Sequence, residues 1–94
     1  MIKSFADKDT EAIWKRKFVK KFAPHIAEAA RECLVMINNA KSWNDLRFPP
    51  SNELHKLKDD RQGQSAISIN KKYRICFIWG NDNNAYEVEI IDYH

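Results

Sequence analysis

Glycine, proline and long apolar runs are scarce in this chain. Its 94 residues include 2 glycines and 3 prolines, counts too low for a disordered chain or a flexible linker. No apolar stretch approaches the roughly 20 residues that a membrane span requires. The opening residues, 1–9, contain no apolar run, so we expect neither a signal peptide nor a membrane anchor. With 44% hydrophobic residues, we expect a single globular domain over residues 1–94 with one core.

Cysteine is also rare, and the two cysteines are far apart in the sequence. Cys33 and Cys76 stand singly, so we interpret them as reduced core residues of a cytoplasmic protein. Because the histidines and cysteines lack paired ligand spacing, we expect no metal and no cofactor. The sequence has no glycine-rich phosphate loop and no Ser-His-Asp spacing. The net charge of +3 permits a polyanionic partner without requiring one.

The first half of the chain has helical patterns. Capping side chains from Asp7 to Thr10 predict a helix that continues through Trp14. We expect its later turns to carry a basic run: Lys15, Arg16, Lys17, Lys20 and Lys21. Pro24 suits the first turn of a second helix, whose buried stripe is predicted to be Ile26, Ala30, Cys33, Leu34 and Ile37. These two helices would form a hairpin.

The second half has strand patterns. The predicted strands cover residues 54–58, 65–70, 73–79 and 86–91, and a short first strand is predicted over residues 2–6. Helices followed by a strand meander favour an α+β fold, with two N-terminal helices packed on one face of a small, mainly antiparallel sheet. The other face would then be open and would display Arg74.

The chemistry-bearing residues lie at the end of the chain and in the strand region. The last strand would present Asp92, Tyr93 and His94 at its end, and His55, Lys58 and Arg74 lie upstream. Cutting RNA without a metal needs a base, an acid and cations that stabilise the charge on phosphorus. Histidine suits the proton transfers because its ordinary pKa, about 6.5, lies near neutrality. Lys58 and Arg74 can supply positive charge, Arg74 as a fork that matches phosphate oxygens.

Each of these residues also has an ordinary structural interpretation. His55 and Lys58 can be solvated surface residues, and strand alternation places them on opposite faces unless the strand is irregular or ends early. Arg74 can be a cross-strand partner of Glu87 or Glu89. The tryptophans Trp14, Trp43 and Trp79 are interpreted as core anchors, and the basic run as a solvated helix face. From the residues alone, a nuclease is one option among several.

The ordered motifs of the chain resemble a known toxin family. Leu54-His55-Lys56-Leu57-Lys58-x-Asp60-Arg61-x-Gly63 is followed by Tyr73-Arg74-Ile75-x-Phe77 and by the terminal Asp92-Tyr93-His94. With the opening Met1-Ile2-Lys3-Ser4-Phe5, this set is similar to the HigB-type toxins of the RelE/ParE superfamily. The resemblance covers the whole chain. It implies a RelE-like fold and places the family's catalytic positions on His55, Lys58, Arg74, Asp92, Tyr93 and His94.

The resemblance also implies an activity and partners. HigB-type toxins are bacterial mRNA interferases that cut messenger RNA in the ribosomal A site. A HigA-type antitoxin with a helix-turn-helix domain neutralises them and binds the shared operator, so operator DNA would be contacted only through the antitoxin. We expect the basic run to contact the ribosome or RNA. The alternatives are a ParE-like gyrase inhibitor without enzymatic activity and a nucleic-acid-binding co-repressor module.

Two parts of the sequence depart from the family pattern. Asp59 stands where the family commonly has glycine. If the backbone there has a positive φ, aspartate adopts it less easily than glycine, and its charge beside Lys58 opposes phosphate binding. The aromatic residue that often follows the glycine matching Gly63 is replaced by Gln64-Ser65-Ala66.

Overall fold

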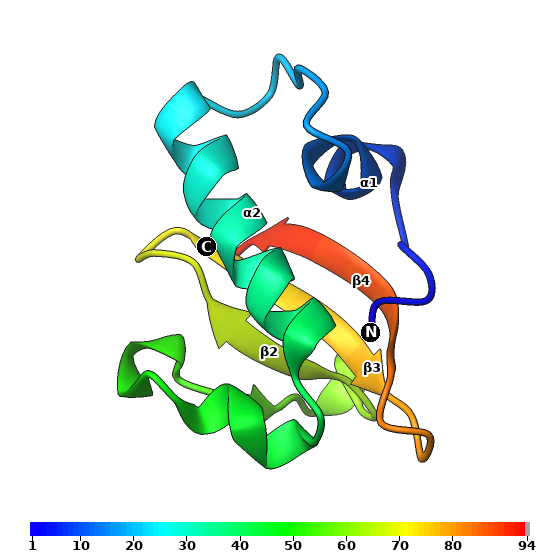
Figure 1. Ribbon diagram of the computed structural model, residues 1–94. Helices are drawn as coiled ribbons and strands as arrows, with labels where there is room; N and C mark the ends of the chain where they lie inside the picture. The colour runs from blue at the N-terminus through cyan, green and yellow to red at the C-terminus, as the bar shows by residue number, and fades with distance from the viewer. Residues whose placement is uncertain (94) are drawn as a thin grey trace.

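The computed structural model of the protein describes residues 1–93 and is shown in Figure 1. Its elements, in chain order, are α1 (Lys8–Trp14), α2 (Pro24–Asn39), the 3-10 helices η1 (Trp43–Arg47) and η2 (Pro50–Asn52), β1 (His55–Lys56), the 3-10 helix η3 (Asp59–Arg61), β2 (Ser65–Ser68), β3 (Tyr73–Trp79) and β4 (Ala85–Asp92). In this part of the chain no helix is both long and apolar enough to cross a membrane.

Helix α1 is short and is held at its first turn. The Asp7 side chain caps it by accepting a hydrogen bond from the Thr10 amide at 2.9 Å. The buried Thr10 hydroxyl accepts a hydrogen bond from the Ile90 amide, which ties the helix to β4. The helix ends at Trp14, and Arg16 has a left-handed φ of 61°. The prediction that the basic run lies on this helix is therefore wrong: from Lys15 onward it lies in the segment between the helices.

Helix α2 agrees with its sequence pattern. Pro24 occupies the first turn, and Ala30, Cys33, Leu34 and Ile37 are buried as predicted, while Ile26 is half-buried. A cysteine on this stripe is shielded from water, and burial raises the pKa of the Cys33 thiol to about 11. Both cysteines are free and buried, so they behave as small apolar core residues.

The sheet is an antiparallel meander in the order β1-β2-β3-β4. Strand β3 has its predicted bounds, but β1 is only two residues long, because the chain bends into η3 directly after it. In β4, Glu87 has a φ of 53° and the register with β3 shifts there, as in a β-bulge. The predicted first strand over residues 2–6 is reduced to two isolated parallel bridges, Ile2 with Ala85 and Phe5 with Val88.

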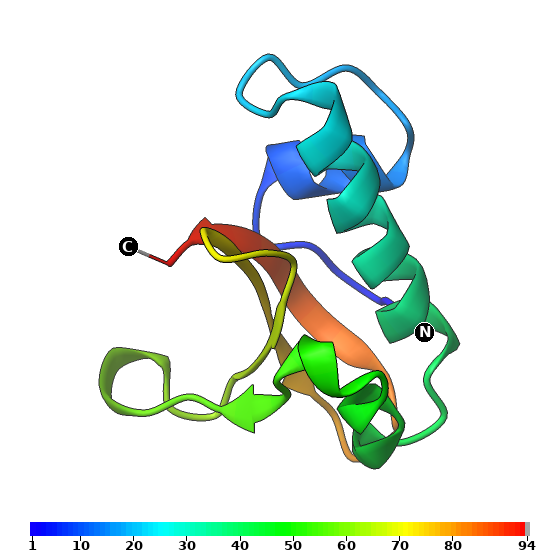
Figure 2. The same ribbon diagram turned by 90° about the vertical axis from the view of Figure 1, so that its left-hand side faces the viewer.

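The two faces of the sheet differ in what covers them. Figure 2 shows both helices on one side, and on this helix-covered face Ile75, Phe77 and Val88 are fully buried against Leu34 and the rest of α2. Neither α1 nor α2 covers the opposite side, here called the open face. Two helices packed on one face of a four-stranded antiparallel sheet confirm the predicted α+β fold.

Candidate active site

The open face gathers polar side chains from distant parts of the chain. Directly paired residues of antiparallel strands share a face, and so do residues two apart on one strand. One row across the four strands is therefore His55, Ala66, Cys76 and Glu89, and the next row is Ser68, Arg74 and Ile91. Register alone thus places His55 and Arg74 on the same face, two strands and one row apart.

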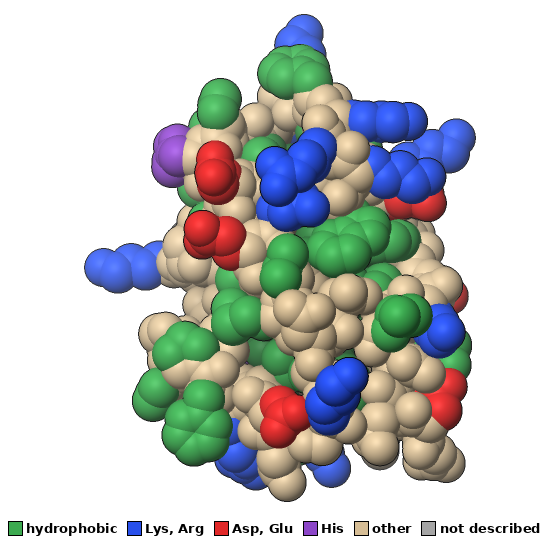
Figure 3. Space-filling model, in the orientation of Figure 1, with side chains coloured by type: hydrophobic (Ala, Val, Ile, Leu, Met, Phe, Trp, Pro, Cys, Tyr) green, Lys and Arg blue, Asp and Glu red, His purple; other side chains and the backbone are tan. Residues whose placement is uncertain are grey.

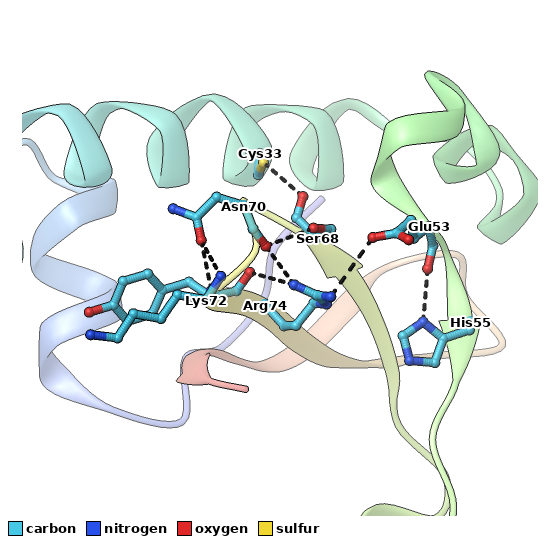
Figure 4. Close-up of polar contacts among 8 residues, drawn as sticks. Cys33, Glu53, His55, Ser68, Asn70, Lys72 and Arg74 are labelled. Atoms are coloured by element: carbon cyan, nitrogen blue, oxygen red, sulfur yellow. Dashed lines mark hydrogen bonds and ion pairs between the residues drawn. The ribbon is translucent and has the colours of Figure 1, made fainter. Parts of the chain in front are cut away.

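Glu53 links His55 to Arg74, as Figure 4 shows. Its backbone carbonyl oxygen lies 2.8 Å from Nδ1 of His55, and its carboxylate lies 3.8 Å from Nη2 of Arg74. A carbonyl oxygen can only accept, so Nδ1 of His55 carries the hydrogen. In the neutral ring, Nε2 is then the nitrogen with a free lone pair, which is the state that a general base requires. Sequence reasoning missed Glu53, whose left-handed φ of 51° no motif indicated.

Arg74 is held firmly in this site. Its Nη1 donates to the backbone oxygens of Asn70 at 2.6 Å and Tyr73 at 3.2 Å. The guanidinium carbon lies 4.4 Å from the centre of the Tyr93 ring, a cation–π contact. The side chain is only 13% exposed, so it is less open than predicted. Its acidic partner is Glu53 rather than Glu87 or Glu89, which corrects the alternative interpretation of a cross-strand pair.

The three terminal residues have different positions. Tyr93 follows β4 on the open face, and its amide donates to the Lys72 oxygen at 2.7 Å, which ties the strand end to the β2–β3 hairpin. Asp92 pairs in register with Tyr73, whose ring lies on the helix side. The Asp92 carboxylate lies 3.9 Å from Lys72 Nζ. His94 lies outside the described residues. Arg74 and Tyr93 are therefore in contact, while Asp92 and His94 stay predicted members of the site.

Lys58 lies at the start of a projecting loop. Strand β1 stops at Lys56, and the exposed Lys58 precedes η3. The early end removes the strict alternation that would place Lys58 opposite His55. The next residue, Asp59, has a φ of 57°, so the position does require the left-handed backbone that glycine adopts most easily.

Arg61 is a second arginine on this face that sequence reasoning did not assign. From η3, its Nη1 reaches Glu89 of β4 at 3.1 Å and Gln64 at 3.1 Å. The Cys76 thiol lies buried in the same row, and burial raises its pKa while the nearby Arg61 charge opposes that rise. The contact ties the loop that carries Lys58 to the floor of the open face. Its signal in the sequence was the Asp60-Arg61 pair of the family motif.

The predicted ribosome-binding cations form a separate surface. Lys15, Arg16, Lys17, Lys20 and Lys21 are all exposed. Figure 3 shows Lys and Arg side chains gathered at the upper part of the molecule, where the segment joining α1 to α2 lies. Phe18, within this basic loop, is 84% exposed. The loop borders a groove of about 600 Å³ against α2.

The open face can support metal-free acid–base chemistry on a phosphodiester. It combines an imidazole of defined tautomer, a fixed guanidinium and a phenol. Among residues 1–93, no group of three or more metal-ligating side chains is gathered.

Comparisons with known structures and sequences agree on the class of protein. A chain of the YoeB–YefM complex from Staphylococcus aureus superposes with a TM-score of 0.59 over 100% of this chain and 98% of that one, at 15% identity. This likeness establishes the fold. The sequence profile of the family described as "RelE-like toxin of type II toxin-antitoxin system HigB" matches residues 3–94.

One named relative narrows the assignment, and an uncharacterized protein is also similar. Toxin HigB-1 of Vibrio cholerae serotype O1 is 31% identical over 80 residues, which are 84% of each chain. An uncharacterized protein of Haemophilus influenzae is 36% identical over 61 residues, covering 65% of this chain and 58% of its own length. The fold and the profile define a RelE-like toxin of a toxin–antitoxin system. Within that class, the chain belongs to the HigB-like family, as its motifs predicted.

Proposed function

We propose that this toxin is a ribosome-dependent endoribonuclease that cuts messenger RNA in the ribosomal A site without a metal. The observation that carries the proposal is the connected set His55, Glu53, Arg74 and Tyr93 on the open face. An imidazole and a half-buried, fixed guanidinium, linked through Glu53 on one face, meet the two main requirements of phosphodiester cleavage, which are proton transfer and charge stabilisation.

The reaction requires two proton transfers around one phosphorus. The 2′-oxygen forms a bond to phosphorus while the bond from phosphorus to the 5′-oxygen breaks. One proton leaves the 2′-hydroxyl, and one joins the departing 5′-oxygen. His55 Nε2 is suited to the first transfer, and the predicted terminal residue His94 supplies the second. Asp92, which pairs in register with Tyr73, would orient a histidine rather than transfer a proton.

Cations and an aromatic ring complete the proposed site. Arg74, with its guanidinium fixed at several points, stabilises the extra negative charge on the phosphate oxygens without reorganising. Lys58 adds a second cation from the projecting loop. Tyr93 holds Arg74 by its ring face and presents its phenol at an exposed position.

The proposed partners follow from the toxin–antitoxin class. We propose a HigA-type antitoxin that neutralises this toxin and binds operator DNA through its own helix-turn-helix domain. The exposed basic loop would contact ribosomal RNA, where surface cations give binding that depends strongly on salt. Ribosomes are the site of action, so the toxin would act in the cytoplasm.

Primer extension on a defined messenger RNA tests this function. Purified protein is compared with and without translating ribosomes, and cuts are expected only with ribosomes. His55→Ala and His94→Ala should each slow cleavage by about 10²- to 10⁴-fold, the usual loss for a general acid or base. His25→Ala is the matched control, because His25 is exposed on the first turn of α2.

Circular dichroism and urea unfolding must show that each variant is folded. Full cleavage by both His55→Ala and His94→Ala would refute the assigned chemistry. Gyrase-dependent DNA damage without messenger RNA cleavage would instead support the non-enzymatic alternative.

A further inference from the structure

A hollow of about 600 Å³ lies on the other side of β1 from His55. Lys56 and its β2 partner Ser65 face away from the open face, because they alternate with His55 and Ala66. The lining includes Trp43, Lys56, Gln62, Gln64, Ser65 and Trp79. This site, here called the Trp43 hollow, is not used by the chemistry proposed above.

The Trp43 ring is held in place and attracts cations. Its Nε1 donates to the Ser65 hydroxyl at 2.9 Å, which fixes the orientation of the indole. Lys56 Nζ lies 5.4 Å from the ring centre, and the Arg47 guanidinium lies 5.1 Å from it. Trp43 is half-buried, so it anchors part of the core, as predicted, and also borders the hollow.

The lining has the chemistry of a single-stranded nucleic-acid site. Its described residues include a lysine and no carboxylate, so the charge favours an anion. Gln62 carries an amide, which both donates and accepts hydrogen bonds and can therefore read the edge of a base. Indole rings stack on any base, and arginine or lysine beside them neutralises the phosphate.

The position of the hollow connects it to the cleavage site. His55 and Lys56 are consecutive, with Cα atoms about 3.8 Å apart, and β1 is the edge of the sheet. Figure 2 shows that this strand is short and lies between the projecting η3 loop and the η1–η2 segment. An RNA strand that crosses this edge can therefore present one phosphate to His55 and a neighbouring base to Trp43.

We propose that the Trp43 hollow binds the base of a nucleotide next to the scissile bond. The base stacks on Trp43, and the exposed side chains of Lys56 and Arg47 move from the ring to the adjoining phosphate. The hollow would then contribute to the choice of cleavage position. This inference rests on the proposed nuclease function, but RNA binding can be measured without cleavage.

The first experiment measures RNA affinity without cleavage. The ligands are fluorescent 2′-O-methyl octanucleotides of A, C, G and U, whose blocked 2′-oxygen cannot attack. Trp43→Leu should weaken binding of at least one of them by roughly 5- to 100-fold, and Trp43→Phe should restore most of the loss because it keeps a stacking ring. Lys56→Gln should weaken binding and lower the salt slope by about one. Lys8→Gln, an exposed lysine on α1, is the control.

The outcomes separate the two proposals. If the wild type cuts messenger RNA on ribosomes but folded Trp43→Leu and Lys56→Gln, together with Gln62→Ala, keep its affinity and its distribution of bases at the cuts, the hollow assignment is overturned and the nuclease stands. If Trp43-dependent RNA binding persists in a protein that does not cut, the hollow stands and the nuclease fails. Stronger binding of a poly-glutamate peptide than of any RNA, abolished in Lys56→Gln, would assign the hollow to a protein partner and overturn the inference.

Discussion

The molecule carries its positive charge in two contrasting regions. On the open face, Arg74 is 13% exposed and contacts two backbone oxygens, Glu53 and the Tyr93 ring. In the basic loop, Lys15 is 54% exposed and pairs with Glu11 through an i,i+4 contact, while Lys21 lies over Phe22. In the first region Arg74 is held from several sides, and in the second five cations are in contact with water.

The difference in exposure suits the two regions to different tasks. A preorganised cation in a sheltered place stabilises charge that develops in a transition state, because nothing needs to move when the reaction occurs. Exposed lysines interact with phosphates over distance and are screened by salt, so they suit docking on a large polyanion. Substitutions in the two regions should therefore affect different measurements.

The largest effect is expected from Arg74→Lys. Lysine keeps the charge but loses the planar fork and the stacking on Tyr93, so ribosome-dependent cleavage should fall by roughly tenfold or more. Sedimentation with ribosomes should change little, because docking depends on the basic loop. Lys71→Arg, in the adjacent hairpin, is the control for altering a cation near the site. Wild-type cleavage rates for Arg74→Lys would show that a fixed fork is unnecessary.

A smaller effect on binding is expected when the basic loop is reversed in charge. The triple variant Lys15→Glu, Lys17→Glu and Lys20→Glu should weaken ribosome binding and lower its salt slope by about three, one for each phosphate that a lysine no longer neutralises. Single-turnover cleavage at saturating ribosome concentration should stay near wild type. Co-sedimentation at several salt concentrations measures the slope.

The control for this variant has the same change in net charge. It reverses three exposed lysines elsewhere: Lys3, Lys8 and Lys41. Equal weakening of binding in both triple variants would show that net charge, and not this loop, determines docking.

The smallest effect is expected at Asp59, which follows Lys58 in the projecting loop. Asp59→Asn removes the negative charge beside Lys58 and keeps a residue that tolerates a left-handed φ, so cleavage should rise a few-fold at low salt. Asp59→Gly should raise it similarly. Its stability should change by less than about 1 kcal/mol, because relief of strain is offset by greater freedom of the unfolded chain. A decrease in cleavage for both variants would mean that the Asp59 carboxylate has a positive role.

Local patterns predicted much of the fold. The α2 stripe and the β3 bounds follow from periodicity, because these elements bury one continuous face. Predictions failed where the backbone departs from a regular period. The basic run was placed on α1, but α1 ends at Trp14 and Arg16 turns left-handed. The capping pattern located the start of that helix, and no comparable signal marked its end.

The candidate site was predicted only in part. The motif resemblance named His55 and Arg74, but it did not indicate that the Glu53 backbone and carboxylate join them, or that Arg61 reaches Glu89. These contacts tie the connecting segments to strands, and the geometry of such segments has no short-range signature. The Trp43 hollow likewise depends on η1, the η3 loop and the end of β3 meeting at one edge.

The sequence by itself determined which residue types were available, the two helices, the main strands and the membership of the HigB-like family, because local periodicity and ordered motifs are properties of neighbouring residues. The tertiary structure decided which of these residues meet. It set the exposure of Arg74, the tautomer of His55 and the separation of the basic loop from the open face. These features depend on strand register, which pairs segments distant in the sequence, and on the left-handed backbone of residues such as Glu53 and Asp59.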